Sequence, residues 1–181
     1  MTTAPESRVE LVITAPESLG PSLAYRTRCR TTIGALTELI AQASRDIVIA
    51  APFMQAGWGL SAGTLADSVR HALLRGVDVD ILGTALGLHT IDRPSLASNA
   101  QGRLRLFQPS VNASDEQQLG SHAKFCVADG SAAYVGSANL TGKGLSDQIE
   151  MGVLVHGDIA RQIKDFWDYA VEAGLFLPVE D

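Results

Sequence analysis

Hydrophobic residues along the chain fall into short apolar runs that alternate with longer stretches of helical spacing. The apolar runs predict β-strands at 9–14, 46–51, 77–82, 104–107 and 150–156. The longer stretches predict helices at 31–44, 65–75 and 158–174. This alternation predicts an α/β fold in which a mixed β-sheet is sandwiched between helices. We expect residues 1–8 to form an N-terminal tail and residues 9–181 a single domain.

The helix ends and faces are marked by particular residue types. Thr31 and Thr32 suit the N-cap of the first helix, and Gly76 suits the end of the second. The third helix carries an apolar stripe that we assign to a core or an interface, made of Ile159, Ile163, Phe166, Trp167 and Ala170. Polar or glycine-rich stretches predict loops at 52–63 and 108–120 and a loop or short helix at 83–102. We expect these three segments to form the rim of a cleft.

The densest candidate chemistry lies between residues 121 and 150. The apolar run after Lys124 ends at Asp129-Gly130, a strong turn signal, which predicts a hairpin with strands at 122–128 and 132–137. Alternate side chains of a strand share a face, so His122 and Lys124 should point to one side. The hairpin should therefore gather six candidate site residues in or near one small volume: His122, Lys124, Asp129, Ser137, Asn139 and Glu150.

These residue types suit attack on a phosphodiester without a metal or another cofactor. A neutral imidazole at His122 can attack phosphorus and form a covalent phosphohistidine. Lys124 and Asn139 would hold the non-bridging oxygens, and Ser137 could add a hydrogen bond. Glu150 is the candidate to orient the imidazole. Asp129 would orient the site or pair with a cation, although it would suit the turn whatever the function.

The segments HAKFCVAD and GSANLT resemble the HKD signature of the phospholipase D superfamily. The resemblance extends from about residue 9 to residue 174 and implies a phospholipase D-like fold. It assigns the same roles: nucleophile to His122, phosphate contacts to Lys124 and Asn139, support to Ser137, histidine orientation to Glu150, and a structural or electrostatic role to Asp129. A degenerate, catalytically silent copy of the motif is the alternative.

The chain carries one such motif. The other histidines, His71, His89 and His156, lack a lysine two positions further on. Enzymes of the superfamily use two histidines, one to attack and one to protonate the leaving oxygen. The resemblance therefore implies a homodimer with a shared active site to which each chain contributes His122.

Composition narrows the function only slightly. The net charge of −6 argues against broad nucleic-acid binding but leaves room for local basic groups, at Arg26, Arg28 and Arg30 and at Arg103 and Arg105. The two cysteines, Cys29 and Cys126, suggest neither a disulfide framework nor a metal site. Cys126 could line the site, although a buried apolar role suits it better. The sequence shows no secretory signal or membrane span, so we expect a cytoplasmic location.

Three functions remain open. Small single-motif members of the superfamily are typically nucleases, so a metal-independent nuclease with DNA as the favoured substrate leads. A phospholipase or phosphatidyl transferase is the alternative, for which Trp58 in the glycine-rich loop is the only hint. A catalytically silent scaffold module of a larger complex is the third. The segment VGSANLTGKGLSDQIEMGVLV also resembles the phospholipase D-like component of the DISARM phage-defence system, which implies defence-system protein partners.

Overall fold

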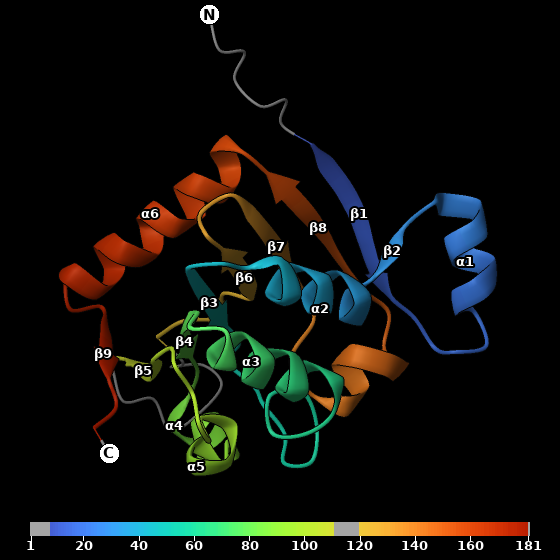
Figure 1. Ribbon diagram of the computed structural model, residues 1–181. Helices are drawn as coiled ribbons and strands as arrows, with labels where there is room; N and C mark the ends of the chain where they lie inside the picture. Colours follow the sequence, from blue (N-terminus) through green and yellow to red (C-terminus); the bar gives the residue numbers. More distant parts are fainter. Residues whose placement is uncertain (1–7, 111–119, 181) are drawn as a thin grey trace, which may run out of the picture.

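The computed structural model describes residues 8–110 and 120–180, and within them one mixed sheet runs through the molecule (Figure 1). Its strand order is β2-β1-β8-β7-β6-β3-β4-β5-β9. The strands are β1 Val9–Thr14, β2 Arg30–Thr31, β3 Asp46–Ala50, β4 Asp78–Leu82, β5 Leu104–Pro109, β6 Phe125–Ala128, β7 Ala132–Gly136, β8 Glu150–His156 and β9 Phe176–Pro178. The strands β3, β4 and β5 are parallel, whereas β6, β7 and β8 form an antiparallel meander that joins β3 to β1.

Helices cover both faces of this sheet. The longer helices are α1 Gly20–Thr27, α2 Thr32–Gln42, α3 Thr64–Leu74 and α6 Asp158–Glu172. Two short helices, α4 Ala85–Leu88 and α5 Arg93–Leu96, follow β4, and the single π-helical turn η2 Lys143–Asp147 precedes β8. In Figure 1, α2 and α3 lie against one face and α6 lies against the other. The predicted α/β class, with a mixed sheet between helices, is confirmed.

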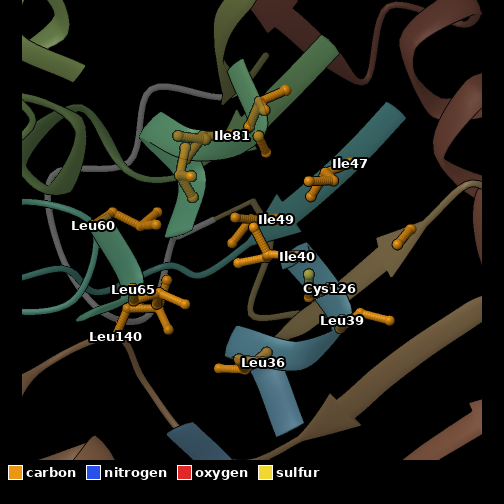
Figure 2. Close-up of a cluster of buried hydrophobic side chains, with 14 of the residues drawn as sticks. Leu36, Leu39, Ile40, Ile47, Ile49, Leu60, Leu65, Ile81, Cys126 and Leu140 are labelled. Carbon is orange, nitrogen blue, oxygen red and sulfur yellow. The ribbon is translucent and has the colours of Figure 1, made fainter. Parts of the chain in front are cut away.

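The larger core lies between the sheet and the pair α2 and α3. Figure 2 shows how its side chains converge: Leu36, Leu39 and Ile40 come from α2, Leu65 from α3, and Ile47, Ile49 and Ile81 from the central strands. Each of these side chains is at most 5% exposed. Burial of this much aliphatic surface is the main force that fixes the central strands and hence the residues at their ends.

The second core lies under α6, where Trp167 packs edge-on to Phe107 and stacked on Phe176. The stripe predicted for this helix is only partly buried. Trp167 and Ala170 are enclosed, whereas Ile159 and Phe166 are nearly half exposed. The helix packs against β6, β7 and β8. Among the described elements it does not pack closely against β1, the strand next to β8, so apolar side chains of β1 remain open on this face of the sheet.

The helices predicted at 31–44, 65–75 and 158–174 and most of the predicted strands agree with the structure to within about two residues. The exception is the strand predicted at 122–128, because β6 pairs with β3 and β7 only from Phe125 onward, so His122 and Lys124 precede the strand. Thr31 is the N-cap of α2, and its hydroxyl accepts a hydrogen bond from the N–H of Gly34. The prediction missed α1, η2 and the short edge strands β2 and β9. Most of the loop predicted at 108–120 lies outside the described residues. No helix in 8–110 or 120–180 combines the length and apolar character needed to span a membrane.

Candidate active site

The candidate site lies where three strands of the meander end at one edge of the sheet. The N–H of Gly136, at the end of β7, donates to the carbonyl of Lys124, just before β6. On the other side of β7, the N–H of Ser137 donates to the carbonyl of Met151, at the start of β8. These bonds place the residues around Lys124, Ser137 and Glu150 in one row across neighbouring strands.

His122 and Lys124 lie in direct contact. The ammonium of Lys124 is 3.2 Å from Nε2 and 3.3 Å from Nδ1 of the His122 ring, and it donates to the His122 carbonyl at 3.2 Å. The imidazole itself is exposed and packs edge-on to Phe53, with the ring centroids 6.0 Å apart. An accessible imidazole next to a fixed cation is the arrangement that a nucleophile attacking an anionic phosphate requires.

Lys124 is unusually enclosed for a lysine, with only 9% of its surface exposed. Burial lowers the pKa of its ammonium, and the negative charge of Glu150 opposes this effect. Because the charged form is poorly solvated in this environment, its interaction with a bound phosphate would be stronger than that of a lysine in water.

Ser137 and Glu150 form the second pair of the site. The hydroxyl of Ser137 donates to a carboxylate oxygen of Glu150 and accepts the N–H of Met151 at 3.1 Å. The predicted contact between Glu150 and His122 is not formed within the described part of this single chain. The serine instead holds the carboxylate at the start of β8, from where its charge acts on Lys124.

Asn139 lies two residues beyond Ser137, in the connection between β7 and η2. Its side-chain oxygen is buried and has no hydrogen-bond partner within 8–110 and 120–180. A buried polar atom without a partner is costly, and such atoms concentrate at binding sites. The structure thus leaves this amide available for a ligand, although it shows no direct contact between Asn139 and His122.

Asp129 lies at the opposite end of β6 from His122 and so outside this cluster. Its carboxylate accepts hydrogen bonds from the N–H groups of Ser44, Arg45 and Asp46 and from the hydroxyl of Ser44. Burial alone would raise the pKa of Asp129, but these hydrogen bonds outweigh it and lower the pKa. Of the two roles that the sequence left open for Asp129, the geometry fits the structural one.

Two further residues are clarified by the structure. Cys126 is 1% exposed and belongs to the core beneath α2, so it does not line the site. Phe53 was not singled out from the sequence, which predicted only a loop there. The structure brings it to His122 because Ala50, three residues earlier, pairs with Phe125. A cavity of about 470 Å³ adjoins His122 and Lys124, and its other walls are mostly apolar side chains of β7 and α6.

Sequence comparison identifies relatives of this fold. Residues 36–169 match the family model described as "Cardiolipin synthase, PLD-like domain". The DISARM protein DrmC of Bacillus paralicheniformis is 29% identical over 167 residues, which are 88% of this chain and 62% of the relative. The chain therefore spans about three fifths of the length of that curated relative.

Solved structures share the fold along almost the whole chain. Nuc from Salmonella typhimurium, a phospholipase D family member, superposes with a TM-score of 0.64 at 17% identity and covers 97% of this chain and 100% of its own. NucT from Helicobacter pylori gives 0.66 at 13% identity, with 95% and 100% covered. Phosphatidylserine synthase of Haemophilus influenzae gives 0.65 at 13%, with 99% of this chain but 41% of its own covered. These likenesses confirm the predicted fold.

Proposed function

Because the chain belongs to the family of phospholipase D-like domains, we propose that it is a metal-independent phosphodiesterase that hydrolyses nucleic acid through a covalent intermediate on His122. The observation that carries this proposal is the contact between the exposed imidazole of His122 and the enclosed ammonium of Lys124. Lys124 supplies the fixed positive charge that neutralises a phosphate as negative charge builds on its oxygens.

In the proposed first step, a ring nitrogen of His122 forms a bond to phosphorus and the bond to the leaving oxygen breaks. A second imidazole gives its proton to that oxygen. In the second step, this now neutral imidazole takes a proton from water, and the hydroxyl oxygen displaces His122 from phosphorus. Asn139 and Lys124 hold the non-bridging oxygens throughout. Glu150, held by Ser137, balances the positive charge of the imidazole that becomes protonated.

The second imidazole requires a second subunit. All four histidines of the chain lie in the described ranges. His71 is on α3, His89 follows α4, and His156 ends β8 at the edge of the sheet opposite to Glu150, near Glu10. No hydrogen bond or ring contact joins any of them to His122 within residues 8–110 and 120–180. We therefore propose a two-fold homodimer in which His122 of each subunit serves one shared site.

An exposed apolar face beside the site supports this dimer. Met151 and Val135, on neighbouring strands, are 56% and 39% exposed, and Ile149, just before β8, is 70% exposed. Ile159 and Phe166 of α6 border the same face and the cavity next to His122. A contiguous apolar surface of this kind at the rim of an incomplete site suits coverage by a second copy of the chain.

Nucleic acid is the substrate class that we favour. The chain matches the complete lengths of Nuc and NucT but less than half of the phosphatidylserine synthase. The exposed apolar residues keep phosphatidyl chemistry as the second candidate, since they could also contact lipid. The similarity to DrmC leads us to propose a role in phage defence together with other proteins of such a system.

The test is cleavage of labelled single- and double-stranded DNA and RNA in excess EDTA, with wild type compared to His122→Asn. Cleavage by wild type alone supports the proposal, and turnover only on phospholipid vesicles would replace it with the lipid function. Equal mixing of wild type with His122→Asn subunits tests the shared site. One shared site per dimer predicts about a quarter of the wild-type rate, whereas independent sites predict about half.

A further inference from the structure

A half-exposed tryptophan is held at the rim of the site by backbone contacts. Trp58 lies in the loop after β3, and this loop is fixed to the segment that follows Asn139. Met54 pairs with Leu140 in a parallel bridge, and the side-chain oxygen of Gln55 accepts the N–H of Gly142 at 3.1 Å. A Cβ atom at position 142 would lie 3.0 Å from two atoms of the indole ring. The indole thus packs closely on this glycine, and a side chain at position 142 would push the ring outward by a few tenths of an ångström.

The remaining surface of the indole faces solvent. Trp58 is 49% exposed, which is unusual for a residue that normally buries its large ring. Its large neighbour Leu60 is 2% exposed, and the other residues around it are small: Ala56, Gly57, Gly59 and Ser61. The loop thus presents a single flat aromatic ring and no cluster of apolar side chains that could enter a lipid layer.

A cation directly follows Gly142, the residue on which the ring rests. The side chain of Lys143 is exposed and forms no hydrogen bond or ion pair with any residue of 8–110 or 120–180. Residues 51–66 contain no charged side chain, and η2 carries Lys143 at its start and Asp147 at its end. Because Lys143 directly follows the glycine that supports the ring, its ammonium can contact the phosphate of a nucleotide that stacks there.

The same surface adjoins the candidate site. Lys143 begins η2, four positions after Asn139, and η2 packs against β1. The last residue of β1, Thr14, pairs with Glu150. The aromatic ring and the cation thus lie along the rim formed by the strand ends that carry the site residues.

We propose that Trp58 and Lys143 form a nucleotide-binding subsite that selects single-stranded nucleic acid. An unpaired base stacks on the open surface of the indole, and Lys143 contacts its phosphate. A base inside a duplex is already stacked between its neighbours, so it cannot occupy this position without being extruded. This inference rests on the proposed nuclease function and deepens it by naming the class of substrate.

The binding test uses the full-length His122→Asn chain, which should bind without turnover, and a single-stranded oligonucleotide as the probe. The chain has two tryptophans, and the other one, Trp167, is 2% exposed. Stacking should quench the fluorescence of Trp58, and the quenching should disappear when Trp58→Phe is added. Duplex DNA of the same length should quench much less. No quenching by single strands would overturn the proposal, and quenching by anionic vesicles in place of oligonucleotides would reassign the surface to a membrane.

The kinetic test uses chains with an intact His122. Trp58→Ala should raise KM for the single strand by about 5- to 150-fold, the range expected from the loss of one base-stacking contact. Trp58→Phe should recover part of this loss, and Lys143→Gln should reduce the salt dependence of KM. The matched controls are Tyr25→Ala on α1, an 89% exposed aromatic residue, and Arg8→Gln, an exposed arginine that precedes β1 at the end away from Glu150. Both should leave KM unchanged.

The outcomes separate this inference from the proposed function. Equal losses in the two control variants, or a KM that is insensitive to Trp58→Ala in a chain that does cleave, would contradict the subsite and leave the proposed nuclease function standing. If single strands quench Trp58 but the wild-type protein cleaves no polymer, the result would support the subsite and contradict the proposed nuclease function. Thermal unfolding of every variant confirms that the comparison is made between folded chains.

Discussion

The ammonium of Lys124 is almost equally distant from the two ring nitrogens of His122, at 3.2 and 3.3 Å. An atom in the plane of the ring could not reach both nitrogens at these distances without colliding with the carbon between them. The ammonium therefore lies over the face of the ring, and neither in-plane lone pair is blocked by it. A ring nitrogen of His122 therefore remains free to attack phosphorus while the ammonium stays beside it.

The first prediction concerns His122. His122→Asn removes the proposed nucleophile but keeps a polar side chain of similar size at an exposed position, so the fold and the dimer should persist. Cleavage should fall to background in the presence of EDTA. Gel filtration and thermal unfolding check the integrity of the variant. A rate within about tenfold of wild type would contradict the mechanism, because loss of a covalent nucleophile normally costs several orders of magnitude.

The second prediction concerns Lys124, whose replacement should weaken catalysis and alter the pH dependence of stability. Lys124→Ala should lower kcat/KM by about 100-fold or more, because it removes the charge that stabilises the transition state. A larger loss from Cys126→Ala would contradict this assignment.

Burial lowers the folded-state pKa of Lys124 below the ordinary value of 10.5, so the unfolded chain binds this proton more tightly than the folded chain does. At neutral pH the buried ammonium destabilises the folded chain. This cost falls, and the free energy of unfolding rises, as pH increases from the folded pKa of Lys124 towards its unfolded pKa. Lys124→Met should be more stable than wild type near neutral pH. Its advantage should shrink in alkaline solution, which urea unfolding at a series of pH values would measure.

The third prediction concerns the coupling between Ser137 and Glu150, which share a hydrogen bond. Glu150→Gln should reduce kcat less than His122→Asn does, because an amide can still accept a hydrogen bond. Ser137→Ala should lower kcat by about tenfold, since it releases the carboxylate from its position. The double variant should be less impaired than the product of the two single losses predicts. Simple multiplication of the two losses would show that the residues act independently.

The sequence predicted the parts of this molecule that depend on local pattern. Helix α3 has a hydrophobic period that specifies both the element and its buried face, and strand β8 is marked by a continuous apolar run. The Asp129-Gly130 turn fixes the hairpin that brings Lys124 beside Ser137. Helix α1 was missed because it buries no residue, so its sequence carries no apolar stripe. The π-helical turn η2 depends on tertiary contacts rather than on propensity.

The site was predictable in its members but not in all of its contacts. The prediction that His122 and Lys124 share a side assumed that both lie in a strand. Both precede β6, which begins at Phe125, yet their side chains are in contact. The partner of a long side chain depends on the strand register between β7 and β8. This register places Glu150 within hydrogen-bonding distance of Ser137. The carboxylate of Asp129 binds a segment more than 80 residues away in the chain, which no local pattern could reveal.

The fourth prediction separates stability from catalysis at Asp129. Asp129 has a left-handed backbone with φ of 55°, which asparagine also tolerates. Asp129→Asn should therefore keep the turn but weaken the charge-assisted bonds to residues 44–46, at a cost of about 1–3 kcal/mol in the free energy of unfolding. The kcat of the folded variant should stay within a few-fold of wild type. A loss of kcat as large as that of Lys124→Ala would show that Asp129 takes part in catalysis.

The stability cost at Asp129 should depend on pH in a defined direction. Its hydrogen bonds lower the folded-state pKa, so the ionised carboxylate contributes stability above the unfolded pKa and loses this contribution as pH falls through the folded one. Wild type and Asp129→Asn should thus differ most near neutral pH and converge in acid. Urea midpoints measured at both ends of this range provide the test, and a difference that grows in acid would contradict the assignment.

The fifth prediction concerns the two thiols. Cys126 is buried in the core, and burial raises the pKa of its thiol to about 12, so almost no thiolate exists at neutral pH. Cys29 is partly exposed. A thiol reagent should label one cysteine per native chain, the label should disappear in Cys29→Ser, and activity should survive labelling. The second thiol should react only when the chain unfolds. Labelling of Cys126 in the native protein with loss of cleavage would show instead that its sulfur lies within reach of the site.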